Sequence, residues 1–195
     1  MWKIGLTGSI GSGKSLVASL FDTMGFPVYH ADEEAKRFYL YPLVTRIVSD
    51  EFGREILDEA GHIDKKKLAA IVFSDLSRLQ WLNALIHPMV KEDFACWCNL
   101  HHAHSFVIHE AAILFESGFD KYFDRIILVT APKVKRLERV VKRDQVDAAQ
   151  ILQRMDHQWD DEKKARLADY LINNEGNELL LPQVEAVCNT LKKLC

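Results

Sequence analysis

The chain has 195 residues, enough to bury the core of one main domain with small insertions. Its composition, 48% hydrophobic and 27% charged, is ordinary for a globular protein, and a formal net charge of −3 argues against a protein that coats nucleic acid, which needs a large basic surface. No apolar run approaches the roughly 18 residues of a membrane span, and no secretory h-region precedes the first glycine-rich turn. The chain has only four cysteines, too few for a disulfide framework. We therefore expect a cytoplasmic protein that binds neither membranes nor nucleic acid.

The N-terminal region alternates short apolar runs with helical spacing. Residues 3–6 form a short, mainly apolar segment that leads into a glycine-rich turn, which predicts a buried strand. Apolar residues recur at helical spacing over residues 14–24, and Gly25 ends that helix. Residues 26–29 form a second predicted strand, and helical spacing resumes at Ala31.

The middle of the chain is predicted to be helical throughout, from about residue 42 to residue 103, with a break at Pro88. Two apolar runs then predict strands at 106–110 and 125–130. Pro132 suits the N1 position of the helix that follows.

The C-terminal region predicts a fifth strand at 170–173 and a closing helix at 179–194. Strands separated by helices are typical of an α/β fold, here a doubly wound parallel sheet of about five strands. The long helical stretch between the second and third strands is then an insertion, and it is large enough to hold a substrate.

Residues 8–15 match the phosphate-loop pattern G-x-x-x-x-G-K-[ST]. Glycines permit backbone angles that turn consecutive N–H groups onto phosphate oxygens, and the helix that starts near Lys14 directs its positive end at the same anion. Lys14 supplies a charge for the β- and γ-phosphates, and the Ser15 hydroxyl can ligate Mg²⁺. Since the loop follows an apolar strand and opens an amphipathic helix, we favour a nucleotide triphosphate site over a chance glycine turn. The contacts expected from this loop are Gly11, Ser12, Gly13, Lys14, Ser15 and Leu16.

Asp32 follows the second strand, at the edge of the sheet where open α/β folds bind ligands. A carboxylate there suits the general base that a phosphoryl acceptor requires. An N-cap for the next helix explains the same residue equally well from its position alone.

Arg136, Arg139 and Arg143 lie three or four residues apart and share one helical face. A solvated basic face is the usual explanation for such a run. Beside a phosphate loop, one or two of these arginines can instead close over the nucleotide and neutralise transition-state charge.

Cys96 and Cys98 precede His101, His102 and His104, a composition that suggests a metal site. The Cys-x-Cys spacing is not that of structural zinc sites, and helical geometry sends the two cysteines to different faces. We therefore favour a helix end with solvated histidines.

Along nearly its whole length the chain resembles the dephospho-CoA kinase family. Residues 4–15 are close to that family's phosphate loop, and residues 28–32 resemble its Val-Ile-Asp-Ala-Asp segment. Many kinases share a phosphate loop, whereas the other matches are more selective. These are residues 63–64, 68–73 and 82–88 in its substrate-domain helices, 113–116 in its Leu-Leu-Phe-Glu turn, 136–144 with Arg154 and Gln158 in its lid, and 168–174 in its last strand.

The resemblance implies the last step of coenzyme A synthesis, in which ATP with Mg²⁺ phosphorylates the ribose 3′-hydroxyl of dephospho-CoA. It implies that Asp32 is the catalytic base, assisted by Lys14 and Arg139, and that the substrate lies near His87 and Asp32. It also makes Arg143 a phosphate contact in a mobile lid and brings Asn174 near the adenine. The implied parts are a nucleotide-binding core (1–34, 104–131 and 166–195), a helical substrate domain (35–103) and a helical lid (132–165), in a monomer or weak homo-oligomer.

Three positions depart from the family pattern. His30 replaces the first Asp of Asp-Ala-Asp, so only Asp32 carries the acidic role there. Leu16 replaces the usual Thr and removes one hydroxyl contact to the α-phosphate. Residues 110–112 stand where a proline often occurs, and Glu110, at the end of the third strand, is a candidate for a water-mediated Mg²⁺ contact.

Two other functions remain open from the sequence. One is a different small-molecule kinase, such as a nucleoside-phosphate kinase, which has less need of a carboxylate base. The other is a P-loop switch or regulatory ATPase, although the guanine-reading Asn-Lys-x-Asp motif is absent.

Overall fold

The computed structural model describes residues 1–145 and 147–194 and divides the chain into two compact units. The first unit, the nucleotide unit, combines Met1–His30 with Cys98–Cys195. The second unit, the helical unit, is Ala31–Trp97. The segment predicted as a lid, residues 132–165, lies within the nucleotide unit.

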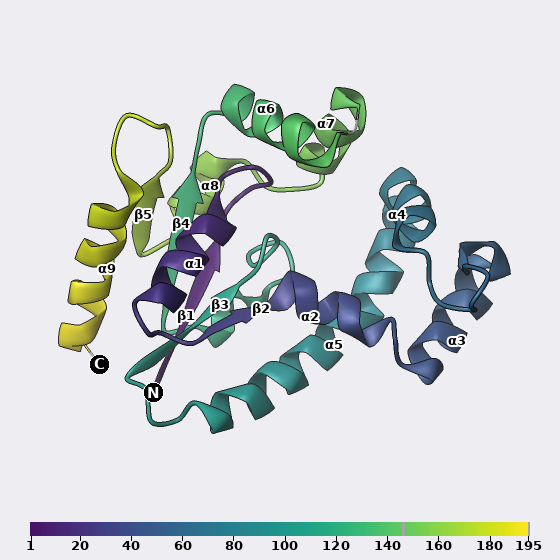
Figure 1. The fold of residues 1–195 in the computed structure, drawn as a ribbon, viewed down its shortest axis with the longest axis horizontal. Coiled ribbons are helices and arrows are strands. Elements are labelled where there is room, and N and C mark those ends of the chain that lie inside the picture. Colours follow the sequence, from purple (N-terminus) through teal and green to yellow (C-terminus); the bar gives the residue numbers. More distant parts are fainter. Residues whose placement is uncertain (146, 195) are drawn as a thin grey trace. The chain divides into compact units, whose positions relative to one another are not determined.

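A five-stranded parallel sheet forms the centre of the nucleotide unit, in the order β2-β3-β1-β4-β5 (Figure 1). This order confirms the predicted doubly wound α/β fold, because the chain places β2 and β3 on one side of β1 and then β4 and β5 on the other side. The strands are β1 (Trp2–Thr7), β2 (Val28–His30), β3 (Phe106–Glu110), β4 (Arg125–Thr130) and β5 (Tyr170–Asn173).

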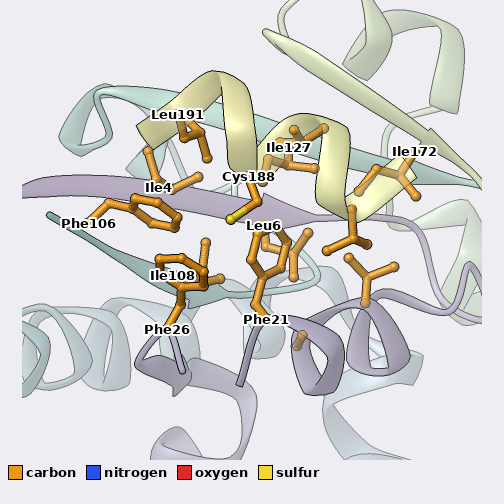
Figure 2. Close-up of a cluster of buried hydrophobic side chains, with 14 of the residues drawn as sticks. Ile4, Leu6, Phe21, Phe26, Phe106, Ile108, Ile127, Ile172, Cys188 and Leu191 are labelled. Atoms are coloured by element: carbon orange, nitrogen blue, oxygen red, sulfur yellow. The ribbon is translucent and has the colours of Figure 1, made fainter. Parts of the chain in front are cut away.

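The main core lies between this sheet and two helices, α1 (Lys14–Thr23) and α9 (Leu180–Leu194), which share one face of the sheet (Figure 1). Alternate residues of a strand point to the same face, so Ile4 and Leu6 both enter this core. Phe21 of α1 is fully buried against them (Figure 2). Residues 126–129 of the inner strand β4 are apolar and all buried, so this strand is apolar on both faces, as in parallel sheets covered on both sides.

Three further helices carry the chain from β4 to β5. α6 and α7 pack through Val140, Ile151 and Met155. Pro132 is the N-cap of α6 and not its N1 residue as predicted, since its extended ψ of 138° precedes the first helical turn. The helices are α6 (Lys133–Asp144), α7 (Ala148–Asp156) and α8 (Asp161–Ala165), and a short 3₁₀ helix, η2 (Phe119–Tyr122), precedes β4.

The helical unit is less regular than predicted, because residues 42–103 are not helical throughout. A turn around Gly61 brings Leu57 and Ile63 into an isolated antiparallel bridge. The side chain of Asp64 then accepts hydrogen bonds from Lys66 N and Lys67 N and starts the next helix. The elements are α2 (Ala31–Phe38), α3 (Pro42–Phe52), η1 (Arg54–Ile56), α4 (Lys65–Ser74) and α5 (Leu76–Leu100).

The break predicted at Pro88 is also wrong, because α5 continues through the proline. Proline removes one backbone donor and normally interrupts a helix. Here Leu82, Ile86, Val90 and Phe94 recur every four residues and are all buried, so the packing of one helix face extends across the proline. No helix in the described part of the chain is long and apolar enough to cross a membrane.

Candidate functional site

The phosphate loop joins β1 to α1, and Gly13 is the N-cap of that helix. Gly11 and Gly13 have φ angles of 80° and 95°, which only glycine adopts easily. A Cβ atom at Gly13 would lie 2.1 Å from Nδ2 of Asn174, and one at Gly11 would lie 2.4 Å from the carbonyl oxygen of Arg136. Both glycines are therefore required by conformation and by close neighbours.

Glu110 is the centre of the polar contacts at this loop. Its Oε1 lies 2.6 Å from Nζ of Lys14 and accepts a hydrogen bond from Oγ of Ser15 over 3.0 Å. Its Oε2 lies 2.8 Å from Nδ1 of His30. The parallel register explains this meeting, because Glu110 lies opposite both Leu6 of β1 and His30 of β2.

The charge of Glu110 follows from its partners. Burial raises the pKa of this carboxyl, but the charge and hydrogen bond of Lys14 and the hydrogen bonds of His30 and Ser15 outweigh burial and lower it overall. An ionised carboxylate can only accept hydrogen bonds, so Nδ1 of His30 is the donor. His30, which departs from the family pattern, thus orients one oxygen of Glu110 while Lys14 and Ser15 occupy the other.

The Ser15 hydroxyl and the Glu110 carboxylate fit a Mg²⁺ ion. Both are hard oxygen donors, and they meet where the positive end of α1 and Lys14 attract phosphate. Mg²⁺ usually takes one or two protein oxygens and completes its shell with phosphate and water. The described residues contain no group of three His, Cys, Asp or Glu side chains that could hold a metal ion by themselves. Cys96 is exposed and Cys98 is buried, as expected for opposite faces of α5.

Arg139 and Asn174 contact the phosphate loop from two other elements. Nδ2 of Asn174 donates to the carbonyl oxygen of Ser12 over 2.8 Å. Nη2 of Arg139 donates to the backbone oxygen of Asn174 over 2.9 Å, and its Nη1 lies 3.4 Å from the carbonyl oxygen of Gly11. The structure therefore brings these two predicted residues together at the loop.

Arg143 and Leu16 are differently placed. Arg143 pairs with Asp144, with 2.6 Å between Nε and Oδ1, and 65% of its side chain is exposed. Leu16 is 54% exposed. The ion pair of Arg143 is thus made with the next residue in the chain and not with the phosphate loop, and the Leu16 side chain is largely exposed to solvent.

Asp32 and His87 belong to the helical unit. Because α2 begins at Ala31, Asp32 lies inside the first turn, so the alternative role as an N-cap is wrong. Burial lowers the pKa of His87, and the nearby carboxylate of Asp32 opposes part of that shift. The two predicted substrate residues thus interact electrostatically within this unit.

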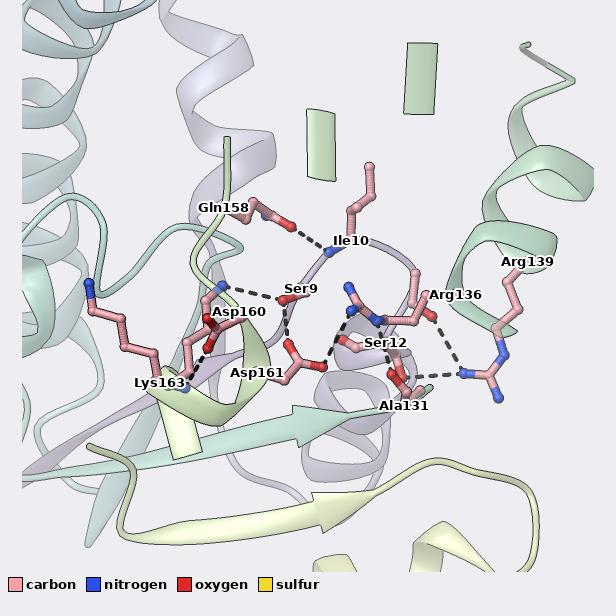
Figure 3. A network of polar contacts seen from close by, with 12 residues as sticks. Ser9, Ile10, Ser12, Ala131, Arg136, Arg139, Gln158, Asp160, Asp161 and Lys163 are labelled. Carbon is pink, nitrogen blue, oxygen red and sulfur yellow. Dashed lines mark hydrogen bonds and ion pairs between the residues drawn. The ribbon is translucent and has the colours of Figure 1, made fainter. Parts of the chain in front are cut away.

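Sequence reasoning missed a second polar cluster, around Ser9 and Ile10 of the loop (Figure 3). Its members come from the segment after α7, from α8 and from the turn after β3. Glu116 and Gln158 stand in stretches that resemble the family, but no sequence pattern links them to each other or to the loop. The residues concerned are Ser9, Ile10, Glu116, Gln158, Asp161 and Lys164.

Comparisons with known proteins agree with one another. The dephospho-CoA kinase family model matches residues 2–179. The chain is 40% identical to a dephospho-CoA kinase of Bacteroides fragilis over 183 residues, which are 93% of this chain and 89% of the relative. It resembles the crystal structure of TT1252 from Thermus thermophilus with a TM-score of 0.76 and 32% identity, over 100% of this chain and 98% of the other. A dephospho-CoA kinase from Campylobacter jejuni gives a TM-score of 0.70 and 25% identity, over 98% and 97% of the two chains.

Proposed function

Since this chain belongs to the dephospho-CoA kinase family, we propose that it transfers the γ-phosphate of ATP to the ribose 3′-hydroxyl of dephospho-CoA, giving coenzyme A and ADP. The observation that carries the proposal is the family match over residues 2–179, which includes the phosphate loop. The cluster of Lys14, Ser15 and Glu110 supports it, because these groups meet where the phosphates of ATP would bind.

On the nucleotide side, the backbone N–H groups of residues 11–16 hold the phosphates at the start of α1. Lys14 carries a positive charge to the γ-phosphate and stabilises the charge that spreads over its oxygens in the transition state. Arg139, next to the loop at Gly11 and Asn174, adds a second positive charge. Arg143 has a long exposed side chain and needs to leave Asp144 to contact phosphate. Asn174 contacts the adenine side.

Mg²⁺ would be held by Ser15 and, directly or through water, by Glu110, and when bound it neutralises the β- and γ-phosphates. Glu110 itself remains ionised and accepts hydrogen bonds from Ser15 and His30. Its carboxylate, 2.6 Å from Nζ of Lys14, orients that side chain before ATP arrives.

On the acceptor side, Asp32 is the general base that removes the proton of the 3′-hydroxyl as the new O–P bond forms. Only Ala31 separates it from His30, so its Cα lies within about 7 Å of the Cα at the end of β2. His87 binds dephospho-CoA as a neutral imidazole, since burial lowers its pKa. We further propose that the protein acts in the cytoplasm as a monomer or weak homo-oligomer.

The test is an acceptor panel with ATP and Mg²⁺, containing dephospho-CoA, nucleoside monophosphates and no acceptor. We expect ADP to form with dephospho-CoA and the product to carry the added phosphate on the ribose 3′-oxygen, located by mass spectrometry of fragments. Turnover with a nucleoside monophosphate but not with dephospho-CoA would identify another kinase. Equal ADP formation without any acceptor would identify a regulatory ATPase.

A further inference from the structure

Ser9 and Ile10, in the first half of the phosphate loop, are held by residues about 150 positions further along the chain. The backbone N–H of Ile10 donates to Oε1 of Gln158 over 2.8 Å. Oγ of Ser9 donates to Oδ1 of Asp161 over 2.5 Å (Figure 3). Neither Ser9 nor Ile10 is among the residues expected to contact the nucleotide, so these bonds hold a part of the loop that lies before the expected phosphate contacts in the chain.

A buried ion pair anchors the residues that hold the loop. The side chain of Lys164 is completely buried, and its Nζ lies 2.8 Å from Oε1 of Glu116 and 3.5 Å from Oγ of Ser9. The same oxygen of Glu116 accepts the backbone N–H of Trp159 over 2.9 Å. A buried ion pair contributes little net stability, because loss of solvation offsets the attraction. What the pair does determine is the position of the segment from Gln158 to Lys164.

The other end of the predicted lid contacts the loop as well. Arg136 of α6 is buried, and its Nη2 lies 3.6 Å from Oδ2 of Asp161. Three residues further along α6, Arg139 contacts the carbonyl oxygens of Gly11 and Ser12 at 3.4 and 3.5 Å. The helix that enters the segment 132–165 and the residues that leave it therefore both bind the phosphate loop.

We propose that Gln158, Asp161 and Lys164 form a brace that positions the phosphate loop for ATP. The loop contains two glycines with positive φ and is conformationally permissive, so without outside contacts it would lose entropy when ATP orders it. A loop already fixed by the brace binds its phosphates more tightly, since that ordering cost is met during folding. The brace residues are positioning residues that need not touch the nucleotide. This inference rests on the proposed binding of ATP at the loop.

The first experiment removes one acceptor of the brace. Gln158→Leu takes away the partner of the Ile10 N–H, whereas Gln158→Glu keeps an acceptor oxygen, and Gln150→Leu makes the same change at an exposed residue of α7. Calorimetry with MgATP measures the Kd, and steady-state assays measure kcat and both KM values. We expect Gln158→Leu to raise the Kd and KM for ATP by about three- to tenfold, the value of one hydrogen bond, without changing the KM for dephospho-CoA. We expect Gln158→Glu and Gln150→Leu to bind ATP like the wild type.

The outcomes separate the brace from the proposed function. Wild-type protein that does not bind ATP would contradict the function and with it the brace. Wild-type protein that binds ATP, with a Gln158→Leu variant that binds it equally well, would contradict the brace alone. An equal loss in Gln150→Leu, or no rescue by Gln158→Glu, would also overturn it.

A second variant separates positioning from stability. In Lys164→Met with Glu116→Gln both charges of the ion pair are removed, while an oxygen remains for the Trp159 N–H. Replacing both partners of a buried ion pair is often neutral or stabilising, so we expect an unchanged or higher Tm. We expect ATP to bind at least about threefold more weakly, because Ser9 loses one anchor. Wild-type ATP affinity in this folded double variant would overturn the brace.

Discussion

The two units of the chain bury different kinds of side chain. Among the described residues, the buried polar and charged side chains all belong to the nucleotide unit, whereas those buried in the helical unit are apolar. A buried charge is costly unless it is paired and hydrogen-bonded, and Glu110, Arg136 and Lys164 each have such partners. The nucleotide unit therefore uses its interior to place charge near phosphate. The helical unit has an apolar interior, and the two residues proposed to act on the acceptor, Asp32 and His87, are only partly buried.

Loss of the proposed catalytic base, which lies in the helical unit, should reduce activity more than any other change considered. Asp32→Asn keeps the shape of the side chain and removes the base, so we expect kcat to fall by roughly 10²–10⁴-fold. The affinity for ATP should stay within about twofold, since the phosphate loop is untouched. Rapid-quench assays and calorimetry measure the two quantities, and wild-type turnover would show that Asp32 is not the base.

Truncation of the helical interior should affect stability and not chemistry. Leu82 of α5 is buried, so Leu82→Ala leaves a cavity in the core of the helical unit, and we expect the free energy of unfolding to fall by about 2–5 kcal/mol. At a temperature where the variant is folded, kcat should equal that of the wild type. Urea unfolding measures the change, with Leu76→Ala, at an exposed leucine of the same helix, as the control. A loss of kcat without a loss of stability would contradict a purely structural role of Leu82.

The buried charge of the nucleotide unit should instead affect activity. Glu110→Gln keeps the size of the side chain but removes the charge between Lys14 and His30. We expect the Mg²⁺ concentration for half-maximal activity to rise by about 10–100-fold, the effect usual for groups around a metal site. A magnesium titration of the rate measures it. The exposed Glu138→Gln on α6 is the matched control, and an equal response of both variants would refute this role.

The buried His109 of the nucleotide unit should make the free energy of unfolding depend on pH. His109 packs against the rings of Tyr29, Phe119 and Phe123, and burial lowers its pKa from 6.5 to about 3. Since the unfolded chain binds a proton near pH 6.5 and the folded chain does not, this residue contributes stability above pH 6.5 that is lost as the pH falls toward 3. At pH 5 the loss is about 2 kcal/mol.

The measurement is the free energy of unfolding at pH 7.5 and pH 5, for the wild type and for His109→Leu. We expect the leucine variant to be less stable at pH 7.5, because it loses the ring contacts, but to lose about 2 kcal/mol less than the wild type on acidification. An equal fall in the free energy of unfolding of the two proteins between pH 7.5 and pH 5 would show that the pKa of His109 is not lowered by burial.

The smallest effect concerns the loop residue that departs from the family pattern. Leu16→Thr supplies a hydroxyl at the start of α1, and we expect the KM for ATP to fall by about two- to tenfold, the range for one hydrogen bond. Leu16→Ala shortens the same exposed side chain without adding a hydroxyl and should leave the KM unchanged. An identical KM in all three proteins would exclude a contribution from this position.

The local sequence pattern was sufficient to predict those strands and helices whose bounds depend mainly on their own residues. The strands predicted at 106–110, 125–130 and 170–173 have the same bounds in the structure, because each is a short segment with an apolar centre. Pattern failed at Pro88 and between Leu57 and Ile63. At Pro88 the burial of one face of α5 overrides the local preference, and between Leu57 and Ile63 a turn closed by backbone hydrogen bonds replaces the predicted helix.

The phosphate loop could be located from the amino-acid sequence alone, since a strand, three closely spaced glycines and the start of a helix at Lys14 all lie within about fifteen consecutive residues. The residues that surround the loop are known only from the tertiary structure. The parallel register brings His30 and Glu110 to Lys14, and the segment after α7 brings Gln158, Asp161 and Lys164 to Ser9 and Ile10. A hydrogen bond or ion pair between residues some 80 to 155 positions apart leaves no periodic pattern in the sequence, because it depends on how the strands and helices pack.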